Sequence, residues 1–179
     1  MESFNELIRR IVTCFDIFGL NYMFTGALAA SYYGVPRTTM DIDVVIDMSE
    51  GSRGRLLSAL RQAELQADAK KIEQALKSDY RKATFRDRKS PYSVDVTFSS
   101  KKLEKKPGTI AGLPTFYQTP EDLILAKLRM IKATVPRERA LKDEEDVKAI
   151  LRFTKVNVET VKKQAKKSNT LPIFKSIIT

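Results

Sequence analysis

The sequence predicts an α+β protein in which helices flank a mixed sheet and the C-terminal third is helical. Helical periodicity opens the chain and returns after residue 119, whereas the middle holds short β-branched or alternating segments. The 179 residues fit a single domain, and a hydrophobic content of 42% argues for a folded chain. We expect a core over residues 1–118 with the helical region 119–179 packed on it, as one structural unit.

The chain is expected to begin with an amphipathic helix. Ser3 and Glu6 form a capping-box pattern, and apolar residues then recur at helical spacing as far as Gly19. A short strand over 21–24 and a helix of small residues over 28–33 follow.

The middle of the chain alternates between strand and helix patterns. Leucine and alanine spacing predicts one helix over 56–65 and a second helix after a break near Asp68. Short runs of β-branched or alternating residues, bounded by turn residues, predict strands. These strands lie over 41–47, 83–85 and 92–98, with a hairpin over 108–117.

The C-terminal region opens with strong signals for a helix start. Thr119 can act as the N-cap, Pro120 is favoured at the first helical position, and Glu121 and Asp122 suit the helix dipole. Further helices are predicted over 137–153 and 158–167.

The composition excludes several kinds of catalysis. The chain has no histidine, so Ser-His-Asp triads, Cys-His dyads and histidine-bound zinc are ruled out. Its one cysteine, Cys14, cannot form an internal disulfide and lies on the apolar stripe of the first helix, as expected of a buried thiol in a reducing compartment. Catalysis must therefore depend on carboxylates, lysine, arginine, hydroxyls or a bound metal.

The chain is strongly basic, with 32 Lys and Arg against 22 Asp and Glu and a net charge of +10. Such a charge attracts nucleic acid, nucleotides or acidic membranes, and it also fits a solvated basic surface with no specific partner. No signal-like N-terminus and no run of roughly 18 apolar residues is present, so we expect a cytoplasmic protein without a membrane partner.

Three aspartates form the candidate catalytic centre. Residues two apart on a strand share a face, so Asp41 and Asp43 present two carboxylates together. Asp95 lies on the polar face of the strand 92–98. We expect these two strands to be antiparallel neighbours, with Asp95 near enough to Asp43 to share a metal ion. A solvated strand face is the alternative for an isolated Asp-x-Asp pattern.

The segments before these carboxylates offer groups that bind phosphate. A strand end runs into a glycine and a helix start, where backbone N–H groups and the helix dipole favour an anion. An arginine and two threonines directly precede the carboxylates, although an ordinary turn and a surface loop would show the same residues. The candidate phosphate-binding residues are Thr25, Gly26, Ala27, Arg37, Thr38 and Thr39.

Lys127 is expected to point inward. It falls within the apolar stripe of its helix, at i+4 from Leu123 and i+3 from Ile124. Its anionic partner is either a nucleotide phosphate or Asp143, which lies on the stripe of the next helix. A snorkelling lysine with a buried stem is a further alternative. We favour the phosphate, because a triple-aspartate site would bring a polyanion nearby.

The order of four short segments resembles the signature of the polymerase-beta nucleotidyltransferase superfamily. These segments are Gly26-Ala27, a short helix, residues 34–39 and residues 41–44. In that superfamily a hydrophobic-Gly-[Gly or Ser] element precedes an Asp-hydrophobic-[Asp or Glu]-hydrophobic strand, and a third carboxylate follows on a neighbouring strand. Segments 119–128 and 142–147 are similar to the small prokaryotic branch that includes the AbiEii and MenT-type toxins. Alanine stands at position 27 where the superfamily has glycine or serine, so a serine contact to phosphate is absent while backbone donors remain.

The resemblance implies a nucleotidyltransferase fold and transfer of a nucleoside monophosphate from a triphosphate, ATP included, to an acceptor hydroxyl, with release of pyrophosphate. Asp41 and Asp43 would hold two Mg²⁺ ions, with Mn²⁺ as a substitute, and Asp95 would complete the site and accept the hydroxyl proton. Lys127 would act in the same centre.

The acceptor is left open among RNA, protein and small molecules, and the lysine runs within 101–106 and 162–167 favour RNA or tRNA. The toxin-like branch implies a cognate antitoxin as a partner. The alternative is a catalytically inactive nucleotide- or RNA-binding module, which Ala27 alone supports.

Overall fold

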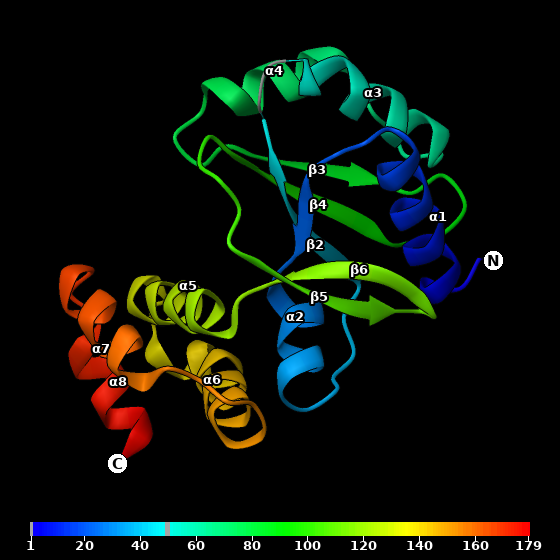
Figure 1. The fold of residues 1–179 in the computed structure, drawn as a ribbon. Coiled ribbons are helices and arrows are strands. Elements are labelled where there is room, and N and C mark those ends of the chain that lie inside the picture. Colours follow the sequence, from blue (N-terminus) through cyan, green and yellow to red (C-terminus); the bar gives the residue numbers. More distant parts are fainter. Residues whose placement is uncertain (1, 49–50) are drawn as a thin grey trace. The chain divides into compact units, whose positions relative to one another are not determined.

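The computed structural model describes residues 2–48 and 51–179. The first part of the chain contains both helices and strands and helices alone follow, which confirms the predicted α+β class (Figure 1). The first elements are α1 (Phe4–Ile17), β1 (Tyr22–Phe24), α2 (Gly26–Tyr33), β2 (Asp41–Asp47), α3 (Ser52–Gln62), α4 (Ala69–Lys77), β3 (Lys82–Arg86), β4 (Ser93–Ser99), β5 (Lys105–Ile110) and β6 (Leu113–Gln118). They are followed by α5 (Pro120–Ala133), the 3₁₀ helix η1 (Arg137–Ala140), α6 (Leu141–Phe153), α7 (Val158–Lys167) and α8 (Leu171–Ile178).

The chain divides into two compact units. The first comprises Met1–Leu28 and Thr38–Gln118, and the second comprises Ala29–Arg37 and Thr119–Thr179. The division falls inside α2, so the start of this helix belongs to the unit with the sheet and the rest to the helical unit. The expectation that residues 119–179 pack on the core as one structural unit stays a prediction.

The first unit is built on a six-stranded mixed sheet with the order β3-β4-β2-β1-β6-β5. β2 and β4 are parallel, as are β1 and β6, and the other neighbouring pairs are antiparallel. The expectation that the strands of Asp43 and Asp95 are antiparallel was therefore wrong. Between them the chain forms α3, α4 and the edge strand β3, and this long crossover returns it so that β4 runs in the same direction as β2.

The core of this unit lies between the sheet and three helices. α1, α3 and α4 gather over one face of the strands (Figure 1). β2 and β4 alternate between buried apolar residues and polar residues, so the face away from these helices carries the polar side chains. The buried residues that these strands supply are Ile42, Val44, Ile46, Val94, Val96 and Phe98.

α1 has the predicted capping box. The Ser3 hydroxyl accepts from the Glu6 N–H at 3.3 Å, and the Glu6 carboxylate accepts from the Ser3 N–H at 2.7 Å. Cys14 is buried, and burial raises the pKa of its thiol, as expected of a structural cysteine.

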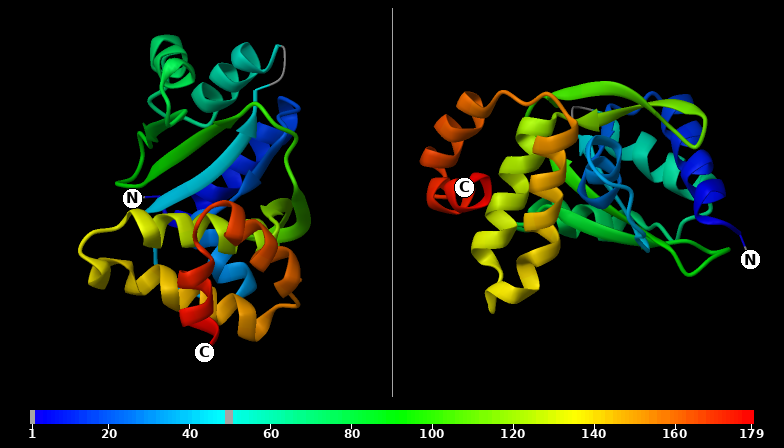
Figure 2. Two further views of the ribbon diagram at one scale, coloured as in Figure 1. Left: turned by 90° about the vertical axis from the view of Figure 1, so that its left-hand side faces the viewer. Right: turned by 90° about the horizontal axis from the view of Figure 1, so that it is seen from below.

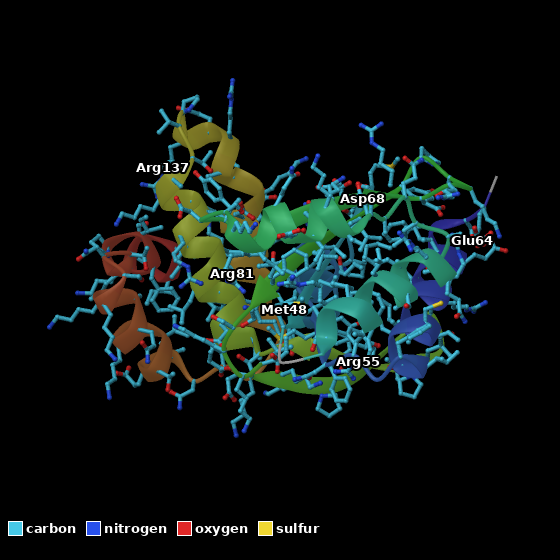
Figure 3. The ribbon with its side chains drawn as sticks, turned by 90° about the horizontal axis from the view of Figure 1, so that it is seen from above. Met48, Arg55, Glu64, Asp68, Arg81 and Arg137 are labelled. Atoms are coloured by element: carbon cyan, nitrogen blue, oxygen red, sulfur yellow. The ribbon has the colours of Figure 1, made fainter. Side chains whose placement is uncertain are left out.

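α4 begins where the sequence shows a break. Asp68 is its N-cap and accepts from the N–H of Lys70 at 2.6 Å. Arg81, in the turn between α4 and β3, donates from Nε to the carbonyl of Phe98 at 3.0 Å and so joins the start of β3 to β4; Figure 3 labels both Asp68 and Arg81.

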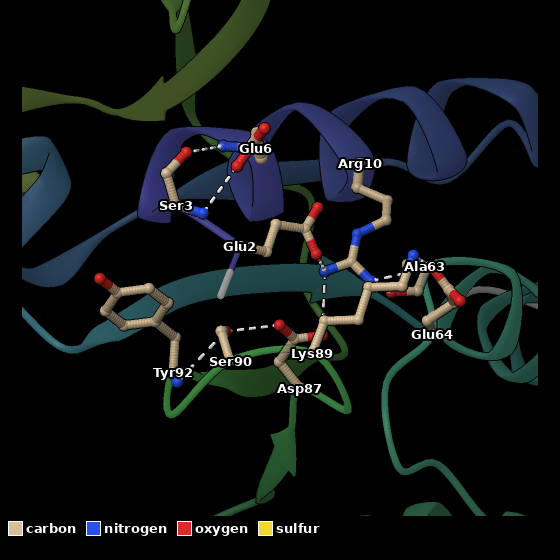
Figure 4. Close-up of polar contacts among 10 residues, drawn as sticks. All are labelled: Glu2, Ser3, Glu6, Arg10, Ala63, Glu64, Asp87, Lys89, Ser90 and Tyr92. Atoms are coloured by element: carbon tan, nitrogen blue, oxygen red, sulfur yellow. Dashed lines mark hydrogen bonds and ion pairs between the residues drawn. The ribbon is translucent and has the colours of Figure 1, made fainter.

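An ion-pair network centred on Arg10 ties α1 to the loop after β3 (Figure 4). Arg10 Nη2 lies 2.9 Å from Asp87 Oδ1, and Nη1 donates to the Ala63 carbonyl at 2.9 Å. The Asp87 side chain is 0% exposed and also accepts from the Ser90 hydroxyl at 2.5 Å. Burial alone would raise the pKa of Asp87, but the hydrogen bonds from Ser90 and Arg10 outweigh it and hold the pKa below its usual value.

The second unit is helical, with α5 in contact with α6, α7 and α8 (Figure 2). Thr119 caps α5 as expected, accepting from the Asp122 N–H at 3.3 Å. Gly34 packs so closely that a Cβ there would lie 2.9 Å from the Cβ of Ala149, and the Thr154 hydroxyl donates to the Tyr33 carbonyl at 2.6 Å. These contacts explain why Ala29–Arg37 belongs with the C-terminal helices.

Within residues 2–48 and 51–179, no helix has both the length and the apolar character that crossing a membrane requires.

Candidate functional site

The polar face of the sheet places two of the three predicted carboxylates side by side. β2 and β4 are in register such that Asp43 is opposite Asp95 and Asp41 is opposite Ser93. Strands lie about 4.8 Å apart, and residues paired across two strands point to the same face. Asp43 and Asp95 are therefore direct neighbours, and Asp41 lies one pair further along.

Hydroxyl groups on the same face of the sheet orient the carboxylates of Asp95 and Asp41. The Thr84 hydroxyl donates to Asp95 Oδ1 at 2.5 Å, and the Ser93 hydroxyl donates to Asp41 Oδ1 at 2.5 Å. Thr84 lies on β3 directly opposite Asp95, so three adjacent strands contribute to this arrangement.

A lysine that sequence reasoning missed lies between the carboxylates. Lys82 Nζ is 2.7 Å from Asp95 Oδ2 and 3.8 Å from Asp43 Oδ1. Partial burial lowers the pKa of Lys82, but its hydrogen bond with Asp95 and the charges of the aspartates outweigh this and raise the pKa, so it is a cation. The sequence did contain a signal for Lys82, namely the alternation of polar and apolar residues in β3. This alternation puts Lys82 and Thr84 on the polar face and Ala83 and Phe85 on the buried face.

The donor set at this position fits a metal cation. Carboxylate oxygens are the ligands that Mg²⁺ and Mn²⁺ prefer, and the Lys82 ammonium shows that a positive group fits between Asp43 and Asp95. In the described part of the chain, however, no three Asp, Glu, Cys or His side chains come together as a metal-binding group. Asp41 is held by Ser93 instead, and the three-aspartate metal site stays a prediction.

The turn from β1 into α2 lies against Asp43. The Thr25 N–H donates to the Asp43 carbonyl at 3.0 Å, and the Thr25 hydroxyl donates to Gln118 Oε1 at 2.6 Å. Gly26 has a φ of +58°, and a Cβ there would lie 2.3 Å from Asp43 Oδ2. Only glycine therefore allows the carboxylate to lie against the start of α2. Ala27 is buried, and phosphate binding by residues 25–27 stays a prediction.

The residues directly before β2 have contacts of their own. Thr39 uses its hydroxyl at the strand start, where it accepts from the Asp41 N–H at 3.2 Å and donates to the Asp41 carbonyl at 3.0 Å. Arg37 belongs to the second unit, where its Nη2 lies 3.0 Å from Asp146 Oδ2. Thr38 is exposed. The phosphate-binding role of all three residues stays a prediction.

Lys127 points inward as expected, and its contacts are with carboxylates of the second unit. Its side chain is 6% exposed, and Nζ lies 2.9 Å from Asp143 Oδ1 and 2.6 Å from Asp146 Oδ2. Asp143 was the structural partner considered from the sequence. Asp146 was missed, although it follows Asp143 by one helical turn on α6. The nucleotide role of Lys127 stays a prediction.

Comparisons with protein-family profiles and with curated proteins gave no match. Solved structures do match over nearly the whole chain. The solution structure of the antibiotic-resistance factor ANT(2'')-Ia is 17% identical with a TM-score of 0.64, covering 96% of this chain and 91% of that one. The crystal structure of ANT(2'')-Ia in complex with adenylyl-2''-tobramycin is 18% identical with a TM-score of 0.63, covering 98% of each chain.

A third match is an antigenic nucleotidyltransferase-like protein from Paracoccidioides brasiliensis. It is 14% identical with a TM-score of 0.57, covering 96% of this chain and 94% of that one. This chain has the nucleotidyltransferase fold. The prediction of a nucleotidyltransferase-type sheet with flanking helices is thus confirmed, whereas membership of the AbiEii and MenT branch stays a prediction. Within the nucleotidyltransferase fold, the carboxylates of β2 and β4 are the candidate active site.

Proposed function

We propose that this chain is a metal-dependent nucleotidyltransferase that transfers a nucleoside monophosphate from a nucleoside triphosphate to an acceptor hydroxyl and releases pyrophosphate. The observation that carries the proposal is the pairing of Asp43 with Asp95 on neighbouring strands of a nucleotidyltransferase fold, beside the glycine turn at the start of α2. Like charges directly opposite each other on neighbouring strands are destabilising, so a merely solvated strand face gains nothing from this pairing, whereas a cation site uses it.

The residues have separate tasks in this proposal. Asp41, Asp43 and Asp95 hold the cation. The hydroxyl of Thr84 keeps the Asp95 carboxylate oriented, and the hydroxyl of Ser93 does the same for Asp41. When bound, a divalent cation neutralises the triphosphate and polarises the reacting phosphoryl group. Asp95 accepts the proton of the attacking hydroxyl. The backbone N–H groups at the start of α2 bind phosphate oxygens.

We propose an RNA end, such as that of tRNA, as the acceptor. Charge supports this choice, because a net charge of +10 attracts polyanions and repels polycations such as aminosugars at long range. Several lysines also remain exposed on β5, α7 and the loop before β5, whereas Lys105 and Lys162 are held by Asn21 and Glu159. The exposed lysines are Lys101, Lys102, Lys106, Lys163, Lys166 and Lys167. A toxic activity on tRNA restrained by a cognate antitoxin is the form that the resemblance to AbiEii and MenT-type toxins implies.

The proposal can be tested by incubating the protein with Mg²⁺ or Mn²⁺ and each of the four labelled triphosphates, with and without total tRNA. We expect label on the RNA and release of pyrophosphate with at least one triphosphate. Asp43→Asn should abolish both signals. Asp47→Asn is the matched control, because Asp47 lies on the same strand and face but contacts Asn21 at the far end of β2. Loss of activity in both variants alike would contradict the assignment of the site.

The second candidate function is a nucleotide- or RNA-binding module without catalysis. The contacts of Lys82 with both carboxylates favour it, because a permanently bound ammonium would keep a metal out. This candidate predicts that the chain binds labelled triphosphate or tRNA in a filter assay and yields no pyrophosphate with any metal or acceptor. An enzyme with a small-molecule acceptor would release pyrophosphate without RNA, and this release distinguishes it from a binding module without catalysis.

A further inference from the structure

The position of Lys82 bears on how a metal can enter the site. Lys82 begins the edge strand β3, opposite Thr97 of β4, and its side chain reaches across the polar face to both Asp95 and Asp43. The ammonium therefore contacts the same two carboxylates that the proposed function assigns to the metal.

An ammonium and a divalent cation cannot share this position. Mg²⁺ or Mn²⁺ binds carboxylate oxygens at about 2.0–2.2 Å. Lys82 Nζ is 2.7 Å from Asp95 Oδ2, so a metal on that oxygen would lie within about 5 Å of the ammonium and be repelled by its charge. A single ammonium also compensates only part of the negative charge of the paired aspartates, whereas a divalent cation matches it.

We propose that Lys82 competes with the divalent cation for Asp43 and Asp95, so that the metal binds only as the lysine leaves. This inference rests on the proposed function, since it assumes that these carboxylates bind a metal. It makes Lys82 a positioning residue that sets the metal affinity of the chain.

The displaced lysine can turn toward solvent at the edge of the sheet. Its side chain is 44% exposed and lines a groove between α4 and β3, together with Lys71, Gln74, Ser78 and Thr84. A metal–triphosphate complex offers a cation to the carboxylates and an anion to the lysine, so metal and triphosphate should bind cooperatively.

The test is a titration of the intact protein with Mn²⁺, in which free Mn²⁺ is measured by electron paramagnetic resonance. Lys82→Met keeps the apolar stem and removes the charge, and we expect it to bind Mn²⁺ about tenfold more tightly than wild type. Lys82→Gln gives a second variant of different polarity, in case Lys82→Met does not fold. Lys77→Met is the matched control for net charge, because Lys77 lies on α4 with its side chain 74% exposed and forms an ion pair with Glu73 of the same helix.

The outcomes separate this inference from the proposed function. If wild type binds Mn²⁺ in a way that Asp43→Asn removes, and neither Lys82 variant binds more tightly than Lys77→Met, the competition is refuted while the metal site stands. If no variant shows Mn²⁺ binding that depends on Asp43, the competition and the metal dependence both fail. Tighter Mn²⁺ binding in Lys82→Met and Lys82→Gln than in Lys77→Met, at a site that Asp43→Asn removes, supports the proposal.

Discussion

Replacing Lys127 by methionine tests whether this lysine is structural or binds nucleotide. The change keeps the apolar stem and leaves the carboxylates of Asp143 and Asp146 without their shared ammonium. Removing one partner of a buried ion pair costs about 3–5 kcal/mol. Arg37 still pairs with Asp146 at 3.0 Å, and the Asp143 side chain is 26% exposed and can hydrate. We therefore expect a loss at the lower end, about 3 kcal/mol.

The loss can be measured by urea unfolding followed by far-ultraviolet circular dichroism, since the chain has no tryptophan. The double variant Lys127→Met with Asp143→Leu should recover much of the stability, because it removes the carboxylate that has lost its partner. Lys132→Met is the control on the same helix. Lys132 Nζ donates a long, exposed hydrogen bond to the Ser168 carbonyl, at 3.4 Å, so the change should alter stability by less than about 0.5 kcal/mol.

Nucleotide binding by the same variants separates the two roles. A lysine that only joins α5 to α6 leaves the triphosphate affinity of the folded Lys127→Met protein unchanged, whereas a lysine that also binds phosphate lowers it. Wild-type stability in Lys127→Met would refute the inference that its two ion pairs hold these helices together.

Three further predictions concern the first unit. Asp43→Asn should reduce nucleotide transfer below detection while Asp47→Asn retains it, as measured by pyrophosphate release; equal activities would remove Asp43 from the site. Gly26→Ala should lower the melting temperature and the activity together, because its φ of +58° strains an alanine by about 1–2 kcal/mol and its Cβ would lie 2.3 Å from the Asp43 carboxylate. Asp87 has a folded-state pKa below its ordinary value of 3.8, so its contribution to stability is complete above about pH 4 and is lost as the pH falls through the folded pKa. Urea midpoints of wild type should therefore fall more steeply below pH 4 than those of Asp87→Asn, and parallel curves would show that Asp87 does not stabilise the fold.

Local patterns in the sequence determined most of the helices and strands. The predicted capping box at Ser3 and the predicted helix start at Thr119-Pro120 are confirmed. Both could be predicted because a helix terminus depends mainly on neighbouring residues. The alternation over 41–47 and 92–98 likewise predicted both strands and their polar faces, since the period of two is a property of the strand itself. α8 was missed, because its eight residues show little more than two turns of periodicity and lack the run of small residues that indicated α2, a helix of the same length.

Only the tertiary structure decided how these elements combine. Whether β2 and β4 are parallel depends on the path of the chain between them, and the pairing of Asp43 with Asp95 depends on register; neither is encoded in the period of a single strand. Lys82 reaches the carboxylates because β3 pairs with β4 at the sheet edge. The sequence thus determined which side chains share a face of each element. The three-dimensional packing of segments far apart in the chain determined which of those faces meet, because long-range contacts form by burial and strand pairing rather than by local preference.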